Sequence, residues 1–122
     1  MVRKIVVHPK RGEVYLVNFD PTVGREIRKT RPAVVIQNDV SNKHSEVIIV
    51  SAISSANSSD PYPNEVFVKK GEGGLDCDSF ILLNQIRTID KTRLLKKLGV
   101  LKPHTVGCIN LAIEISLGLV EF

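Results

Sequence analysis

Apolar and polar positions form short blocks over the first 90 residues, with the β-branched and aromatic content that is typical of strands. Several of these blocks end at turn-forming pairs such as Asp20-Pro21 and Asn38-Asp39. The pattern predicts strands at residues 13–19, 33–37, 46–53, 65–68 and 79–86, with a turn at 38–42 and a polar loop at 54–64. The first three quarters of the chain are therefore expected to be mainly β.

The pattern changes at residue 90. Asp90 has the chemistry of an N-cap and precedes a short helical turn, after which residues 97–101 favour a brief strand. Pro103 suits the first turn of a helix, and Gly118 is a plausible stop for a helix over 103–117. We expect a strongly curved sheet that carries one main helix, an α+β fold in a single domain over residues 1–122.

The helix predicted at 103–117 is apolar on more than one side. One face carries Val106, Ile109, Ile113 and Leu117 at three- and four-residue steps, and a second face carries Leu111 and Ile115. A helix of this kind is either deeply buried or shared with a partner chain.

Charge adds one local feature to this picture. The net charge is +4 and the isoelectric point is near 9.2, a moderate excess that favours a polyanionic partner without requiring one. Four basic residues fall within positions 25–31, with Glu26 as the one acid among them. Apolar runs are too short to cross a membrane, and residues 5–7 are too short for a signal-peptide core, so we expect a cytoplasmic protein without a membrane partner.

Metal and disulfide chemistry find little support in the sequence. Cys77 and Cys108 lack the spacing of a metal or redox motif, so we expect reduced thiols. The three histidines lie far apart in polar contexts. Asp76 and Asp78 flank Cys77, but without a further ligand this pattern predicts a hydrated loop rather than a metal site.

Five motifs in a fixed order carry a family resemblance. They are Arg-Gly-acid at 11–13, Asp-Pro-Thr-x-Gly-x-Glu at 20–26, Arg-Pro-Ala at 31–33, Asn-Asp at 38–39 and Gln-Ile-Arg-Thr-Ile-Asp at 85–90. Together they resemble the MazF/PemK family of toxin endoribonucleases over nearly the whole chain. The resemblance implies an SH3-like curved sheet, a two-fold homodimer, and sequence-specific cleavage of single-stranded RNA with no metal and no cofactor. It also implies a cognate MazE-like antitoxin that blocks the RNA groove.

The resemblance assigns three catalytic candidates. Arg31 matches the family's catalytic arginine, and a planar, permanently charged guanidinium suits the charge that grows on a phosphate. Pro32 biases Arg31 toward extended backbone, so we expect a rigidly held charge stabiliser at the point where loop meets strand. Ser54 matches the catalytic hydroxyl, usually threonine, and should make the same hydrogen bond. Glu26 is the best candidate for the general base, and the proton donor is left open.

Further residues are candidates for binding the substrate. Gln85 is placed to hydrogen-bond a base edge or a phosphate, and Arg87 either binds a phosphate or pairs with Asp90 to hold a turn. Tyr62 is the one aromatic residue in the polar loop and is free to stack on a base. The full set expected to contact RNA is Arg25, Arg28, Lys29, Thr30, Gln85, Arg87 and Tyr62.

Two other functions fit the same scaffold. One is a non-enzymatic poison that resembles the CcdB gyrase inhibitors, although the chain has no tryptophan, the residue that those proteins typically carry at the end of the last helix. The other is an RNA-binding module without cleavage activity. Supercoiling inhibition with intact RNA would favour the first, and tight RNA association without scission would favour the second.

Overall fold

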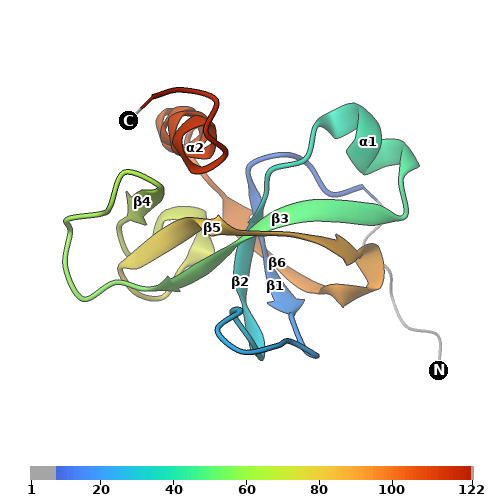
Figure 1. The fold of residues 1–122 in the computed structure, drawn as a ribbon. Coiled ribbons are helices and arrows are strands. Elements are labelled where there is room, and N and C mark those ends of the chain that lie inside the picture. Colours follow the sequence, from blue (N-terminus) through green and yellow to red (C-terminus); the bar gives the residue numbers. More distant parts are fainter. Residues whose placement is uncertain (1–7, 122) are drawn as a thin grey trace.

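A single antiparallel sheet organises the chain (Figure 1). The computed structural model describes residues 8–121, so the expectation for residues 5–7 lies outside it. The strands pair in the order β4-β5-β3-β2-β1-β6. Their bounds are β1 Glu13–Asn18, β2 Thr30–Val35, β3 Val47–Ser55, β4 Glu65–Val68, β5 Ser79–Asp90 and β6 Leu94–Val100; the helices are α1 Asp39–His44 and α2 Pro103–Ser116, with 3₁₀ turns η1 Glu72–Gly74 and η2 Lys91–Arg93.

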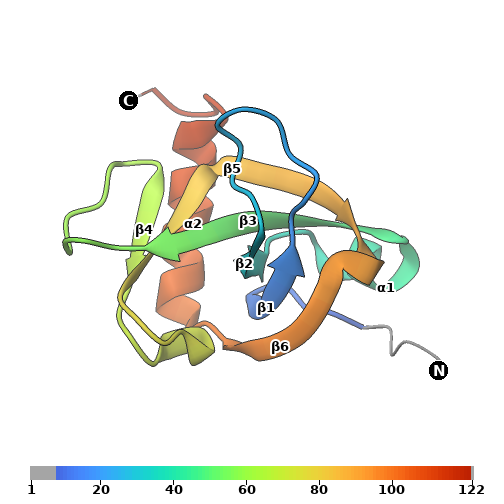
Figure 2. The same cartoon turned by 90° about the horizontal axis from the view of Figure 1, so that it is seen from below.

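Both faces of the sheet are apolar, which explains the near-continuous hydrophobic strands. Neighbouring residues alternate between two clusters, so that Val14 and Val34 belong to one while Tyr15 and Val35 belong to the other. The first cluster includes Ile109 of α2, which lies beside β4 and β5 (Figure 2). The other cluster joins residues of β1, β2, β3, β5 and β6. The predicted α+β fold with a C-terminal helix is confirmed.

Several local predictions need correction. β2 runs over Thr30–Val35 rather than 33–37, and β6 runs over Leu94–Val100 rather than 97–101, because backbone pairing with β1 sets their bounds. Residues 38–42 are not a simple turn, because α1 begins at Asp39 and Asn38 caps it, its side chain accepting a hydrogen bond from the Ser41 amide at 2.8 Å. Asparagine signals a turn and an N-cap equally well, so the sequence did not separate the two. The polar loop begins after Ser55, since β3 includes Ser54 and Ser55. Strand β5 continues to residue 90 rather than stopping at 86.

The C-terminal helix follows its prediction closely. It begins at Pro103, and Gly118 stands just after its end with φ +73°. Ile109 and Ala112 are buried against the sheet, whereas Leu111 is 63% exposed and Leu117 is 61% exposed. Of the two predicted alternatives for this helix, burial on all sides within the chain is therefore wrong. An apolar face is left on the outer side of the helix.

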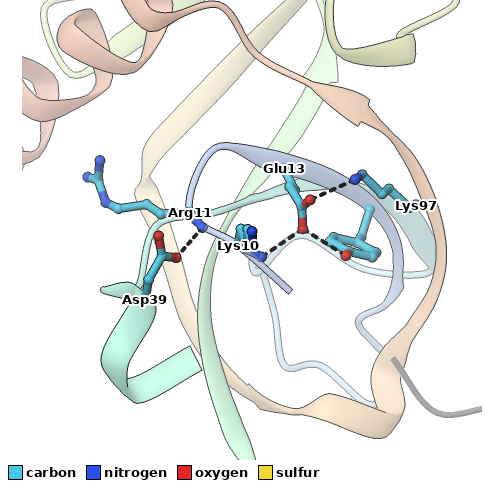
Figure 3. Close-up of polar contacts among 6 residues, drawn as sticks. Lys10, Arg11, Glu13, Asp39 and Lys97 are labelled. Carbon is cyan, nitrogen blue, oxygen red and sulfur yellow. Dashed lines mark hydrogen bonds and ion pairs between the residues drawn. The ribbon is translucent and has the colours of Figure 1, made fainter. Parts of the chain in front are cut away.

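A buried carboxylate fastens the start of β1 to its surroundings (Figure 3). Glu13 accepts hydrogen bonds from the Lys10 amide at 2.7 Å and the Tyr15 hydroxyl at 3.0 Å, and its other oxygen pairs with Lys97 of β6 at 2.6 Å. Burial by itself would raise the pKa of Glu13, but these hydrogen bonds and the charge of Lys97 together hold it below its usual value. Burial and the same carboxylate raise the pKa of Tyr15, which keeps its hydroxyl a donor.

Acid is expected to weaken this contact. Because the pKa of Glu13 is lower in the folded chain, its contribution is complete above the ordinary value of 4.5 and is lost as pH falls through the folded value. Glu13→Gln should lower the free energy of unfolding at pH 7 by about 2 kcal/mol and by less at pH 3.5. Urea titrations at both pH values measure this, with the exposed Glu46→Gln as control. An equal loss at both pH values would contradict the argument.

A candidate active site at the β2–β3 edge

Strand register brings the two strongest catalytic candidates together. The β2–β3 ladder ends at the pair Ala33 and Ala52, and Arg31 and Ser54 each lie two residues beyond this pair on their strands. Both side chains line a small cavity of about 90 Å³. The segment that follows η1 closes it, contributing Leu75, Asp76 and Cys77 together with Ser79. Arg31 and Ser54, 23 positions apart in the chain, thus share one hollow.

Two polar side chains of this hollow, those of Arg31 and Ser54, have donors open to a ligand. Arg31 donates from Nε to the carbonyl oxygen of Arg28 at 3.0 Å, which orients the guanidinium and leaves both terminal nitrogens without a hydrogen bond to residues 8–121. Within the same range Ser54 Oγ makes no hydrogen bond either. The backbone of Arg31 is part of β2 and lies opposite Val17 of β1. Arg31 is therefore held by the sheet, as the sequence predicted.

The loop over residues 20–29 carries three of the four basic residues at positions 25–31, and its two ends are hydrogen-bonded to each other. The Lys29 amide donates to Asp20 Oδ1 at 3.0 Å, and the Phe19 amide donates to the Lys29 carbonyl at 3.0 Å. Glu26 Oε1 accepts from the Val23 amide at 2.5 Å. The carboxylate of Glu26 thus stabilises a turn inside its own loop. The side chains of Arg25, Arg28, Lys29 and Thr30 are exposed.

Strand β5 holds the loop over residues 20–29, which is drawn in blue and passes over the β5 ribbon in Figure 2. Gln85 Oε1 accepts from the Ile27 amide at 3.2 Å. Arg87 donates to the carbonyls of Phe19 and Pro21 at 2.5 and 3.3 Å, and its guanidinium lies 5.9 Å from the centre of the Phe19 ring. Gln85 and Arg87 therefore position the loop.

Two predictions concern the turn after β5: that Asp90 caps it, and that Arg87 pairs with Asp90. Asp90 accepts from the amide and hydroxyl of Thr92 at 2.9 and 2.7 Å, and so caps η2 as predicted. Arg87 points to the loop carbonyls instead of Asp90, so the expected Arg87–Asp90 pair is wrong. Arg93 adds a further hold, donating to the carbonyls of Asn18 and Asp20.

A second, larger cavity of about 410 Å³ lies between the loop and β5. Its lining is basic and amide-rich, and it consists of Val23, Arg25, Glu26, Ile27, Asn84, Gln85, Ile86 and Arg87. Ser54 lies opposite Phe80 on β5, and Gln85 of the larger cavity is five residue steps farther along this strand, a separation of about 17 Å. Glu26 therefore lines a different hollow from Arg31 and Ser54.

Tyr62 lies apart from both cavities. Its side chain is 74% exposed, and it borders a shallow hollow with Pro63, Asn64 and the end of α2 at Ile115 and Ser116. The turn at 62–65 is fixed, because Glu65 Oε1 accepts from the Tyr62 amide at 2.9 Å. The ring is thus presented to solvent on a held backbone.

The segment 75–79 lines the cavity of Arg31 and Ser54, although the sequence motifs did not predict it there. Cys77 Sγ lies 3.5 Å from Ser55 Oγ, and Ser79 Oγ donates to the Cys77 carbonyl at 2.9 Å. No motif signals this contribution, because α1, β3, β4 and η1 lie between Arg31 and this segment in the sequence. Among the residues that the structure describes, no cluster of three or more potential ligands is arranged for a metal ion. No helix within residues 8–121 is long and apolar enough to cross a membrane.

Comparison of the sequence with family models shows the class of protein that carries this curved sheet and C-terminal helix, a toxin of a type II toxin–antitoxin system. Residues 10–117 match the sequence model of the PemK-like, MazF-like toxin family of these systems, and the chain belongs to that family.

Relatives and solved structures agree with this assignment. The chain is 46% identical over 110 residues to Endoribonuclease MazF of Staphylococcus saprophyticus, covering 90% of this chain and 92% of the relative. It is 44% identical to Endoribonuclease MazF of Staphylococcus epidermidis, covering 93% and 94%. Similar folds include MazF from Deinococcus radiodurans (TM-score 0.77, 21% identity, 95% and 99% covered) and a mycobacterial endoribonuclease in complex with its cognate antitoxin (TM-score 0.76, 23%, 93% and 99%).

Proposed function

We propose that this toxin is an endoribonuclease that cleaves single-stranded messenger RNA in the cytoplasm at short sequences, by attack of a 2′-hydroxyl on the neighbouring phosphorus without a metal ion. Relatives that are 44–46% identical over most of the chain are named Endoribonuclease MazF, which favours this enzyme class over the gyrase-poison and RNA-binding alternatives. The observation that carries the proposal is the pair of unengaged donors, Arg31 and Ser54, in one cavity.

The proposed chemistry follows from what these donors do at a phosphate. In the transition state the two non-bridging oxygens gain negative charge, and donors fixed at the place where charge grows lower the barrier. The two terminal nitrogens of Arg31 hold both oxygens in a fork, while Ser54 Oγ donates to one of them. Because Nε is already bound to the Arg28 carbonyl, the fork is oriented before substrate arrives.

The larger cavity is the proposed binding place for nucleotides that flank the cut. Arg25 supplies charge for a phosphate, and the amide group of Asn84 and the Nε2 donor of Gln85, whose Oε1 is bound to the Ile27 amide, suit base edges. Arg28, Lys29 and Thr30 extend the basic surface from this cavity toward Arg31. Arg87 acts there by holding the loop, and Tyr62 offers a stacking surface farther along the chain.

The direct test is digestion of a long single-stranded RNA by the purified protein in excess EDTA. We expect discrete fragments whose ends carry a 2′,3′-cyclic phosphate and a 5′-hydroxyl, because the neighbouring 2′-hydroxyl is the nucleophile. Arg31→Ala and Ser54→Ala should abolish or strongly reduce cutting. Intact RNA, or cutting that Arg31→Ala leaves unchanged, would remove the proposal. Mapping the fragment ends also gives the recognition sequence.

Two partners belong to the proposal. A homodimer would cover the outer face of α2, where Leu111 and Leu117 are exposed beside Leu119 and Val120. Sedimentation should show a dimer at micromolar concentration, and a stable monomer would count against it. The second partner is a MazE-like antitoxin whose binding segment is acidic and disordered when free, since it must cover a basic groove. Equal affinity for a neutral segment would contradict this electrostatic account.

Cys77 provides a chemical probe of the site. Its thiol lines the 90 Å³ cavity, so a bulky adduct at Sγ should occupy the place of the scissile phosphate. We expect N-ethylmaleimide to reduce cleavage at least tenfold, in Cys108→Ser as in the native chain, while Cys77→Ser stays active after treatment. Mass spectrometry confirms the labelled residue. Full activity of a chain labelled at Cys77 would place the chemistry elsewhere.

A further inference from the structure

The chemistry proposed above lacks one component, a group that removes the proton of the 2′-hydroxyl. Arg31 and Ser54 are donors to phosphate oxygens, and a guanidinium is too weak an acid to act as a neutral base near pH 7. Glu26 lies in the larger cavity, where its carboxylate accepts from the Val23 amide. Its position does not favour a proton transfer at the phosphate that Arg31 holds.

Asp76 lies where such a group is needed. It lines the same 90 Å³ cavity as Arg31 and Ser54. Its side chain is exposed and makes no hydrogen bond or ion pair with any residue in the described range 8–121. Asp78, two positions on, is different, because its Oδ1 accepts from the Lys70 amide at 2.9 Å. Of the two aspartates beside Cys77, one is a structural acceptor and the other is open toward the cavity.

The backbone on both sides of Asp76 is fixed. Leu75 is 5% exposed within the core, and its amide and carbonyl bond to Glu72 and Gly71 at 3.2 and 2.9 Å. On the other side, the Cys77 carbonyl accepts from Ser79 Oγ, and the Asp78 carbonyl accepts from the Ala56 amide at 2.8 Å. Asp76 is therefore an open carboxylate on a held segment, which is what a positioned base requires.

We propose that Asp76 is the general base of RNA cleavage. The inference rests on the endoribonuclease function proposed above. Asp76 takes the proton of the 2′-hydroxyl as the 2′-oxygen forms its bond to phosphorus. The bond from phosphorus to the 5′-oxygen breaks, and that oxygen takes a proton from solvent water. The products are a 2′,3′-cyclic phosphate and a 5′-hydroxyl, and Asp76 then releases its proton to solvent.

The absence of an Arg31–Asp76 ion pair supports this division of roles. The two groups line one cavity but are too far apart to form a salt bridge. The guanidinium is thus available to the phosphoryl oxygens and the carboxylate to the adjacent hydroxyl. A carboxylate beside a phosphate also repels it, so Asp76 does not contribute to substrate binding. Its removal should therefore lower kcat without raising KM.

The test compares Asp76→Asn with Asp78→Asn in the full-length chain, using a short single-stranded RNA that contains one mapped cleavage site. We expect Asp76→Asn to lower kcat about a hundredfold with KM unchanged or reduced. Asp78→Asn, on the same segment, should keep kcat within about threefold, because Asp78 does not line the 90 Å³ cavity and an asparagine Oδ1 still accepts from the Lys70 amide. An equal kcat in Asp76→Asn and the native chain, a loss that lies entirely in KM, or an equal loss of kcat in Asp78→Asn would each overturn the proposal.

The pH profile separates a base from a structural residue. In the native chain the rate should fall on the acid side as the base is protonated, and this limb should flatten in Asp76→Asn. The other titratable groups that line the cavity are Arg31 and Cys77, and Cys77→Ser should keep the limb. An unchanged acid limb in Asp76→Asn would overturn the proposal.

A modified substrate distinguishes a base from an acid. With a bridging sulfur in place of the 5′-oxygen, the leaving group needs no protonation, so the loss in Asp76→Asn should persist. Restoration of the native rate would instead make Asp76 the proton donor and overturn its role as base. If Arg31→Ala is inactive while Asp76→Asn is fully active, the proposed function stands and this inference alone fails.

Discussion

Replacing Arg31 by lysine is expected to lower the rate of RNA cleavage by about a thousandfold, although the charge is kept. Lysine is a point charge that donates in no fixed direction, so it does not reproduce the fork on two phosphoryl oxygens. It also loses the hydrogen bond from Nε to the Arg28 carbonyl, which orients the side chain. Single-turnover kinetics with saturating enzyme measure this loss without a contribution from binding.

Arg28→Lys is the matched control. Arg28 is exposed and contributes its carbonyl, rather than its side chain, to the contact with Arg31. Its replacement should change cleavage by less than about threefold at moderate salt, because a flexible surface cation is interchangeable with another. Near-native activity of Arg31→Lys would show that a single positive charge suffices, and the argument from a planar fork would then be wrong.

Gly74→Ala is expected to have the largest effect on stability. Gly74 has φ +73°, and a Cβ added there would lie 1.9 Å from the carbonyl oxygen of Leu98 and 2.6 Å from its carbonyl carbon. Both obstacles are backbone atoms of β6, so relief requires η1 to separate from the strand. We expect the free energy of unfolding to fall by about 4 kcal/mol or more, measured by urea denaturation. Displacement of η1 should also reduce cleavage, since residues 75–79 line the site.

Gly118→Ala isolates the conformational part of this effect. Gly118 has the same φ of +73°, but a Cβ added at this position would meet no atom within 4 Å. It should therefore lose about 1 to 2 kcal/mol, the cost of a left-handed backbone for a residue with a side chain. The difference between the two variants measures the steric term. Similar losses in both would show that η1 moves away from Leu98 easily.

Much of the fold could be predicted because local chemistry and tertiary structure agree. The strand at 65–68 has its predicted bounds, and Asp90 caps the turn that follows β5. The helix begins at Pro103, where a missing amide hydrogen costs nothing. Errors arose where one residue type serves two structures, as Asn38 does before α1, or where polar residues continue a strand, as Ser54 and Ser55 do in β3.

The sequence by itself determined the family, the order of the elements and the candidacy of Arg31 and Ser54, because ordered motifs and periodicity are properties of the chain alone. Only the tertiary structure decided which side chains share a cavity. In the structure Glu26 and Arg31 line different cavities, and Gln85 and Arg87 hydrogen-bond to the loop over residues 20–29. Asp76, from a segment without a motif, lines the cavity of Arg31. The reason is that antiparallel register and sheet curvature set distances between residues far apart in sequence, and no local pattern encodes them.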